Sequence, residues 1–521
     1  MSSLLHLGGA VLAGRVWRLL GTNLQQTVKR YNGESSSVAL SFRTFSSSTF
    51  LGTTTRDSDE VTWLHPGDKR LDLIIAMNNN KFFHNGVQLT INTDTPLEPE
   101  HVSQVLTHLY NKVEVLRLCL RQRDNQWWYC TMPKPALDFE VVNGPDSFME
   151  GEAMVNTPFN LSEGPLWQVR LMPLSSDYPC LWPEVKEKFP YQNKVLFNFH
   201  HGIVDGPDLL SITGLFTKLL EDYISKIPID KQQFGQLVDH SHTSKIVQQM
   251  TEELEKDPQK LKLMLNELKN RKHTPLLVEA FGTPSSPPNI STENLQYAVL
   301  DFSEVNKFNE ECKARKITFN SGFIGLVNTA LVELVREAGI IRDIYNISSL
   351  HSIDLRRYMK GYSEVYPMGF HTLSISHTMA TPYNVKDIFW EYATQFDTEF
   401  RSNLKNKQIL RDFALRKMTL PDTCNLDHLY ATPSPPKYDY IFTNMFLPRF
   451  FNYGVGRRVQ QTEIKYYVPL NASDFVFFTG ICNIREKVEF DMFYSPYCIN
   501  SDTAQMCHDK VVSVFREIIN S

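Results

Sequence analysis

The chain has 521 residues, of which 42% are hydrophobic, 12% aromatic and 21% charged, with a formal net charge of -5 at pH 7. This is the composition of a globular protein long enough for two or three domains, and the slight acidic excess argues against a nucleic-acid partner. No stretch reaches the roughly 18 uncharged apolar residues of a transmembrane segment. The eight cysteines follow no metal-ligand spacing, which argues against a metal site. We also expect no bound cofactor.

The first 55 residues differ from the rest of the chain in charge and composition. They are rich in serine and threonine, and apolar residues recur at helical spacing from Leu4 to Leu20. A single acid, Glu34, stands against the basic residues Arg15, Arg18, Lys29, Arg30 and Arg43. This balance predicts a mitochondrial transit segment over residues 1–55 and a location in the matrix. A disordered tail on a cytoplasmic protein is the alternative.

Residues 60–225 are predicted to form the first α/β unit. Strand-like runs such as GVQLTINT (86–93) alternate there with helices within His101–Leu120 and Leu209–Tyr223. The alternation predicts a mixed unit with helices packed on a sheet.

The segment Lys194–Gly206, KVLFNFHHGIVDG, points most directly to chemistry. Its β-branched and aromatic residues predict a buried strand, and Gly202 supplies loop freedom after it. Successive strand side chains point to opposite faces, so His200 and His201 cannot aim at the same spot. We therefore predict that one imidazole is buried and the other faces a cavity, where it can accept a proton near neutral pH.

Residues 226–294 are predicted to be a helical insertion and linker. Within them, 243–273 mixes both signs of charge with apolar residues at helical spacing, and Pro258 divides the run. We expect an amphipathic hairpin with one face in solvent; a lid or partner-docking element is the alternative. The proline-rich segment 282–289, GTPSSPPN, then precedes a second unit at 295–521.

Several segments on both sides of the histidine pair carry a family resemblance. They are NTPFNLSEGPLWQVRL (Asn156–Leu171), the helical stretch Phe308–Val335, SIDLRRYM (Ser352–Met359) and DYIFTNMF (Asp439–Phe446). Together with HHGIVDG, the chain resembles the condensation-domain-like acyltransferases over most of residues 60–520. That superfamily includes peptide-synthetase condensation domains, alcohol acetyltransferases and polyketide-associated acyltransferases, with chloramphenicol acetyltransferase as a distant structural relative.

The resemblance implies both a fold and an activity. The fold would be α/β, with two chloramphenicol-acetyltransferase-like mixed-sheet subdomains that form a V and a channel between them. The activity would be transfer of an acyl group from a thioester to an alcohol, amine or thiol. We expect free acyl-CoA as the donor, a carrier protein acting in trans as the alternative, a small-molecule acceptor, and a monomeric enzyme.

The family pattern also implies roles for the residues of the motif. His201 would be the general base and His200 its buried neighbour. Asp205 would be structural and paired with an arginine, for which Arg356 has the matching context and Arg357 is the fallback.

Two further roles concern the surroundings of the base. Gly206 would allow either a close backbone approach or a positive φ. Thr443 or Asn444, at a later strand end, would donate to the thioester oxygen as negative charge develops on it.

Other interpretations remain open at the level of sequence. A metal site built from His200, His201 and Asp205 is disfavoured because adjacent strand residues diverge. A binding protein that keeps the fold without catalysis is the main alternative function. The segment Asp474–Phe478, DFVFF, lacks both glycines of the plant acyltransferase pattern Asp-Phe-Gly-Trp-Gly, so this chain is not expected to be of that type.

Overall fold

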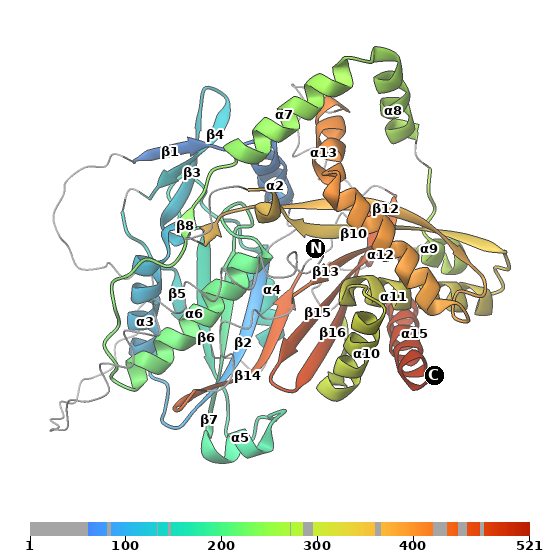
Figure 1. Ribbon diagram of the computed structural model, residues 1–521. Coiled ribbons are helices and arrows are strands. Elements are labelled where there is room, and N and C mark those ends of the chain that lie inside the picture. The colour runs from blue at the N-terminus through green and yellow to red at the C-terminus, as the bar shows by residue number, and fades with distance from the viewer. Residues whose placement is uncertain are drawn as a thin grey trace, which may run out of the picture.

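A computed structural model describes residues 61–80, 85–132, 134–143, 147–270, 272–284, 295–359, 366–419, 435–445, 456–468 and 474–521. The predicted transit segment lies outside these residues, as does most of the proline-rich linker. The described chain forms two mixed α/β halves that lie side by side, with the earlier part of the chain in one and the later part in the other (Figure 1).

The first half is built on a five-stranded sheet in the order β14-β2-β7-β6-β5. Its strands are β2 (Asn85–Thr93), β5 (Phe139–Val141), β6 (Trp167–Pro173), β7 (Tyr191–Phe199) and β14 (Val459–Tyr467). Only β5 and β6 pair in parallel. Strand β14 belongs to the later part of the chain and pairs with β2, an exchange that the sequence division at residue 295 does not show.

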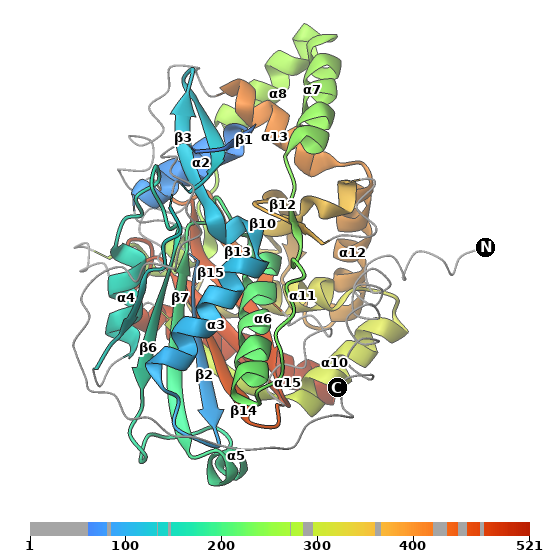
Figure 2. The ribbon, with the colours of Figure 1, turned by 90° about the vertical axis from the view of Figure 1, so that its left-hand side faces the viewer.

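Helices α3 (Pro99–Lys112) and α6 (Gly206–Ile224) cover one face of this sheet, where Figure 2 shows them side by side. Strand β7 supplies Phe197 and Phe199 to that face, and the Phe197 ring meets Phe216 of α6 edge-on at 5.1 Å. Each such buried phenylalanine stabilises the fold by about 1.5–3 kcal/mol. Asn198 points the other way and donates to the carbonyl of Met154 in α4 (Ser147–Asn156), as strand alternation requires.

The second half is built on a six-stranded sheet in the order β12-β10-β13-β15-β16-β9. Its strands are β9 (Leu295–Asp301), β10 (Ile344–Asp354), β12 (Thr372–Pro382), β13 (Tyr438–Asn444), β15 (Phe475–Ile484) and β16 (Lys487–Tyr494). One face packs on α10 (Phe302–Ala314), α11 (Phe319–Glu337), α12 (Phe389–Lys405) and α15 (Ser501–Asn520). Side chains of the opposite face, including Ile441, Cys482 and Phe493, join the core of the first half.

The helical stretch predicted at 308–335 is two helices, because the chain bends by 108° between α10 and α11. Helix α11 is almost entirely buried and forms the centre of the second core. Among the described residues no single helix has both the length and the apolar composition to cross a membrane, and the bent pair α10 and α11 meets that test only jointly.

The insertion forms two helices, α7 (Ser241–Glu255) and α8 (Pro258–Asn270). The second begins at Pro258, where the break was predicted. Val247 and Leu254 of α7 pack on α13 (Gln408–Thr419), whereas α8 buries no residue fully. The hairpin is therefore amphipathic, with α7 against the second half and α8 largely in solvent (Figure 1).

The remaining elements are short or peripheral. A three-stranded sheet has the order β1-β4-β3, and β8 pairs with β11 in parallel. These elements are β1 (Trp63–Pro66), α2 (Lys69–Asn79), η1 (Glu114–Arg117), β3 (Leu118–Arg123), β4 (Gln126–Thr131), α5 (Pro183–Lys188), β8 (Gln236–Leu237), α9 (Leu276–Phe281), η2 (Leu355–Tyr358) and β11 (Pro367–Met368).

Candidate functional site

The two histidines lie in the short turn between β7, which ends at Phe199, and α6. His200 is only 1% exposed; its Nδ1 accepts from the backbone N–H of Gly202 at 3.0 Å, and its ring meets Phe159 edge-on. His201 is 9% exposed and lines a cavity. The structure thus separates the two imidazoles, with His200 inside the first half and His201 at the cavity wall.

A backbone carbonyl orients the ring of His201. Its Nδ1 lies 2.8 Å from the carbonyl oxygen of Val204, which also accepts from Asn85 at 3.4 Å. A carbonyl can only accept, so Nδ1 carries the proton of the neutral ring and Nε2 keeps the lone pair. Burial lowers the pKa of His201, and the Val204 carbonyl and the Asp205 charge oppose that shift without reversing it. His201 is therefore neutral at pH 7 and can act as a base through Nε2.

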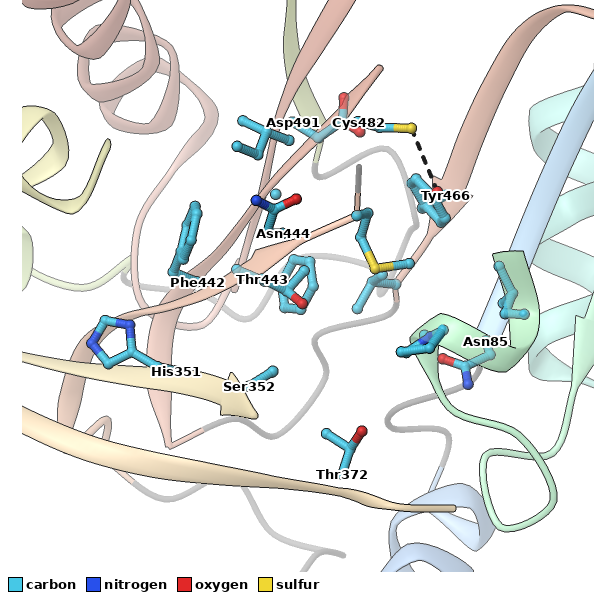
Figure 3. A pocket seen from close by; sticks show the side chains of 18 of the residues that line it. Asn85, His351, Ser352, Thr372, Phe442, Thr443, Asn444, Tyr466, Cys482 and Asp491 are labelled. Carbon is cyan, nitrogen blue, oxygen red and sulfur yellow. Dashed lines mark hydrogen bonds between the residues drawn. The ribbon is translucent and has the colours of Figure 1, made fainter. Parts of the chain in front are cut away.

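The cavity has a volume of about 240 Å³ and is lined by both halves of the molecule. Asn85, Gly86, His201 and Gly206 come from the first half and its motif. The opposite wall is the second-half sheet, where Ser352, Phe442, Thr443, Asn444, Phe478, Gly480 and Asp491 line it. Figure 3 shows Asp491 and Cys482 at the end of the cavity opposite Thr372. Apolar and aromatic side chains supply most of the lining surface, and polar side chains from both halves also face the cavity.

Asp205 has no exposed surface and binds Arg356, not His201, among the described residues. Arg356 donates from Nη1 to Oδ2 at 2.8 Å and from Nη2 to Oδ1 at 3.2 Å. The backbone N–H of His371 and the hydroxyl of Thr372 also donate to Oδ2. Asp205 also caps α6 by accepting from the backbone N–H of Asp208. The pair joins the motif of the first half to the end of β10 and to β12 in the second.

Arg356 holds a second buried carboxyl that sequence reasoning missed. Its Nη2 donates to Oδ1 of Asp208 at 2.9 Å, and the N–H of Gly369 donates to Oδ2 of Asp208 at 2.7 Å. Burial would raise the pKa of Asp205, but the charge and hydrogen bonds of Arg356 outweigh it and the net shift is downward. Burial and the neighbouring Asp205 charge raise the pKa of Asp208 despite Arg356. Of these two buried carboxyls, Asp205 is therefore the one that the arginine holds in its charged form. Asp208 lies three residues after Asp205, in the first turn of a helix. An acidic residue at that position is ordinarily interpreted as helix capping, so its sequence position does not indicate a buried ion pair.

Gly206 begins α6 without a positive φ. Of the two reasons predicted for glycine here, a positive φ or a close backbone approach, the structure therefore supports the close approach. A Cβ at this position would lie 3.2 Å from the Sδ of Met445. Met445 follows directly on β13, so the glycine lets the helix start approach the strand end that carries Thr443 and Asn444.

The two oxyanion candidates at the end of β13 differ in what they contact. Both line the cavity (Figure 3). The side-chain amide of Asn444 donates to Asn320, at the start of α11, at 2.7 Å. That hydrogen bond uses one of the two amide N–H groups of Asn444 and ties the side chain to the helix layer.

The metal interpretation finds no support in the geometry. Among the described residues no group of three or more His, Cys, Asp or Glu side chains is arranged to hold a metal ion. Asp205 is engaged with Arg356, and the two imidazoles of the motif diverge.

Solved structures of known proteins share this fold. The condensation domain of the Monacolin K polyketide synthase MokA has a TM-score of 0.59 at 12% identity, covering 88% of this chain and 98% of that one. The trichothecene 15-O-acetyltransferase of Fusarium sporotrichioides has a TM-score of 0.59 at 12% identity, covering 87% and 94%. Polyketide synthase associated protein 5 of Mycobacterium tuberculosis has a TM-score of 0.57 at 10% identity, covering 88% and 100%. No protein-family model matches the sequence, and neither does any curated protein.

At these identities the likeness establishes the fold. It spans both halves and nearly the whole of each relative, so the chain has the α/β fold of condensation domains and related acyltransferases. The fold class and the resemblance predicted from sequence are confirmed at that level.

Proposed function

We propose that this protein is an acyltransferase that moves an acyl group from a thioester to an alcohol, amine or thiol, with His201 as the general base. The observation that carries the proposal is the orientation of His201. Its Nδ1 is bound to the Val204 carbonyl at the wall of a cavity shared by both halves, which leaves Nε2 as the basic atom. The Val204 carbonyl thus fixes the tautomer and orientation of the ring, which is one of the two roles of the aspartate in a catalytic triad.

The reaction needs one group that accepts a proton and one that donates a hydrogen bond to the oxyanion. His201 Nε2 takes the proton of the acceptor as its oxygen, nitrogen or sulfur attacks the thioester carbon. The Thr443 hydroxyl donates to the oxyanion that forms on the former carbonyl oxygen. When this oxyanion collapses, the carbon–sulfur bond breaks, the imidazolium returns its proton to the thiolate, and a free thiol leaves. While His201 is charged, the Val204 carbonyl keeps its hydrogen bond to the ring.

The donor is proposed to be acyl-CoA, with an acylated carrier protein as the alternative. Phe400 and Phe442 give the cavity apolar walls suited to a hydrocarbon acyl chain. No bound cofactor is needed, because the thioester already activates the carbonyl.

The test is turnover by the purified full-length chain with acetyl-CoA, longer acyl-CoAs and an acylated carrier protein, against a panel of alcohols and amines. Release of free thiol reports the reaction. His201→Ala should lower kcat by about 10²–10⁴-fold. The matched control is His242→Ala, a partly buried histidine of α7 that does not line the cavity, which should leave the rate unchanged.

Two results would overturn the proposal. One is equal turnover by wild type and His201→Ala. The other is a rise in the melting temperature of the wild type on addition of a thioester, without any release of thiol. That result would instead support a binding protein that keeps the fold.

The location in the mitochondrial matrix is likewise a proposal, and it rests on the basic, serine-rich composition of residues 1–55. A fusion of these residues to a fluorescent protein should accumulate in mitochondria. Diffuse cytosolic fluorescence would remove the proposal and favour a cytoplasmic protein.

A further inference from the structure

Three residues form a row across the sheet that walls the cavity. Thr443 of β13 pairs with Gly480 of β15, and Gly480 pairs with Asp491 of β16. Residues in register on neighbouring strands project from the same face, and all three line the cavity. The row begins at the proposed oxyanion donor and ends at a carboxyl group.

Gly480 keeps the middle of the row open. A Cβ at this position would lie 3.6 Å from Thr443 Cγ2 and 3.7 Å from the Phe478 ring. Even a methyl group would therefore occupy part of the space between the side chains of Thr443 and Asp491. Neighbouring strands are about 4.8 Å apart, so the backbone positions of Thr443 and Asp491 are about 10 Å apart. An extended chain of several carbons can lie across the glycine between the two side chains.

Asp491 is 6% exposed, and its side chain meets the cavity without a hydrogen-bond partner among the described residues. Lys465 of β14, a cation whose charge acts on Asp491, pairs with Glu463 at 3.0 Å and lies over the ring of Tyr297. Glu489, on the same strand, is also buried. Among the described residues, the carboxyl groups around Asp491 therefore outnumber the cation Lys465, and of these groups Asp491 is the one that lines the cavity.

We propose that this row is the acceptor subsite, and that Asp491 binds a primary ammonium group at the far end of an alcohol or amine acceptor. The inference rests on the proposed acyl transfer, because it places the reacting end of the acceptor near Thr443 and His201. It names the acceptor class: a small amino alcohol or diamine whose cationic end lies several carbons from the group that is acylated.

The chemistry of the subsite suits an ammonium ion. A buried carboxylate without hydrogen bonds is unstable until a donor reaches it, and an ammonium supplies both donors and the opposite charge. The rings of Phe478 and Phe493 flank the row and can contact the cation.

Binding at this subsite should depend on pH. Burial raises the pKa of Asp491 to about 7; Lys465 opposes the rise and Glu463 adds to it. Other titratable groups facing it are Glu489 on β16, Cys482 on β15, Tyr466 on β14 and Tyr297 on β9. An ammonium binds the ionised carboxylate, so its affinity should increase as the pH rises from 6 to 8.

The experiment compares ω-amino alcohols that have several carbons between the amine and the hydroxyl with n-alkanols in which a methyl group replaces the ammonium. Acyl-CoA turnover and the ligand-induced rise in melting temperature are both measured. The wild type should prefer the amino alcohol by about tenfold or more in kcat/KM, the worth of a hydrogen bond to a charged group. Asp491→Asn should reduce this preference to about one. Asp509→Asn removes an exposed carboxyl of α15, 65% exposed, and should keep the preference.

A second variant tests the open row without removing a charge. Gly480→Val should weaken turnover of the longer amino alcohols more than that of ethanolamine, because its methyl groups fill the space beside Thr443.

The outcomes distinguish a failure of the proposed ammonium subsite from a failure of the proposed acyl transfer. Acylation of alkanols with no preference for ammonium, or a preference that survives in Asp491→Asn, overturns the subsite and leaves the acyltransferase standing. Amino alcohols that raise the melting temperature only when Asp491 is present, with no turnover of any acceptor, support the subsite and remove the proposed reaction.

Discussion

Replacing Asp205 with asparagine should destabilise the protein strongly although the side chain hardly changes in size. The carboxylate is fully buried and receives two charge-assisted hydrogen bonds from Arg356, at 2.8 and 3.2 Å, besides those from His371 and Thr372. Breaking a buried ion pair from one side costs about 3–5 kcal/mol. Arg356 keeps Asp208 and two backbone carbonyls, so we expect the lower end, about 3 kcal/mol.

The structure offers a matched control on the same arginine. Asp354 accepts from Arg356 at 3.1 Å, but its side chain is 44% exposed. Solvent screens such a pair, so Asp354→Asn should cost no more than about 1 kcal/mol. Urea unfolding at pH 7, followed by tryptophan fluorescence, compares the two variants with the wild type.

A double-mutant cycle with Arg356→Gln isolates the pair itself. The costs of Asp205→Asn and Arg356→Gln should not add, because each variant already removes the shared interaction. If Asp205→Asn unfolds at the same urea concentration as Asp354→Asn, the reasoning that the buried pair holds the two halves together is wrong.

Three further predictions follow from the site. Burial lowers the pKa of His201, so kcat/KM should decrease on the acid side with a midpoint below pH 6.5, the ordinary pKa of histidine. A midpoint at or above pH 6.5 would contradict the assigned environment. Thr443→Val should lower kcat by about 10²–10³-fold and Asn444→Ala much less, since Asn444 is tied to Asn320; equal losses would disprove the choice of donor. The folded-state pKa of Asp491 is raised to about 7, so its ionisation costs stability once the pH exceeds the unfolded value near 3.8. Asp491→Asn should therefore raise the melting temperature at pH 8 more than at pH 4, and a uniform shift would refute this.

The sequence predicted where the histidine pair lies relative to the secondary structure. The apolar run before His200 and His201 indicated a strand end, and alternation predicted that the two rings would diverge. The pairing of Asp205 with Arg356 came from the family resemblance, because 150 residues separate the partners and nothing local connects them. The ring partner of His201 was not predicted, since any residue has a carbonyl and only the turn decides that Val204 supplies it.

The sequence by itself determined local features such as the strand before the histidine pair and the helix break at Pro258, because apolar periodicity, glycine and proline act over a few residues. It did not show the bend between α10 and α11. Tertiary structure decided what lies across the cavity. Strand β14 pairs with β2, and Thr443, Gly480 and Asp491 align in one row, only through pairings between segments far apart in the chain. Their spacing along the chain carries no trace of this row, because strand register is set by the packing of whole faces and not by any single residue.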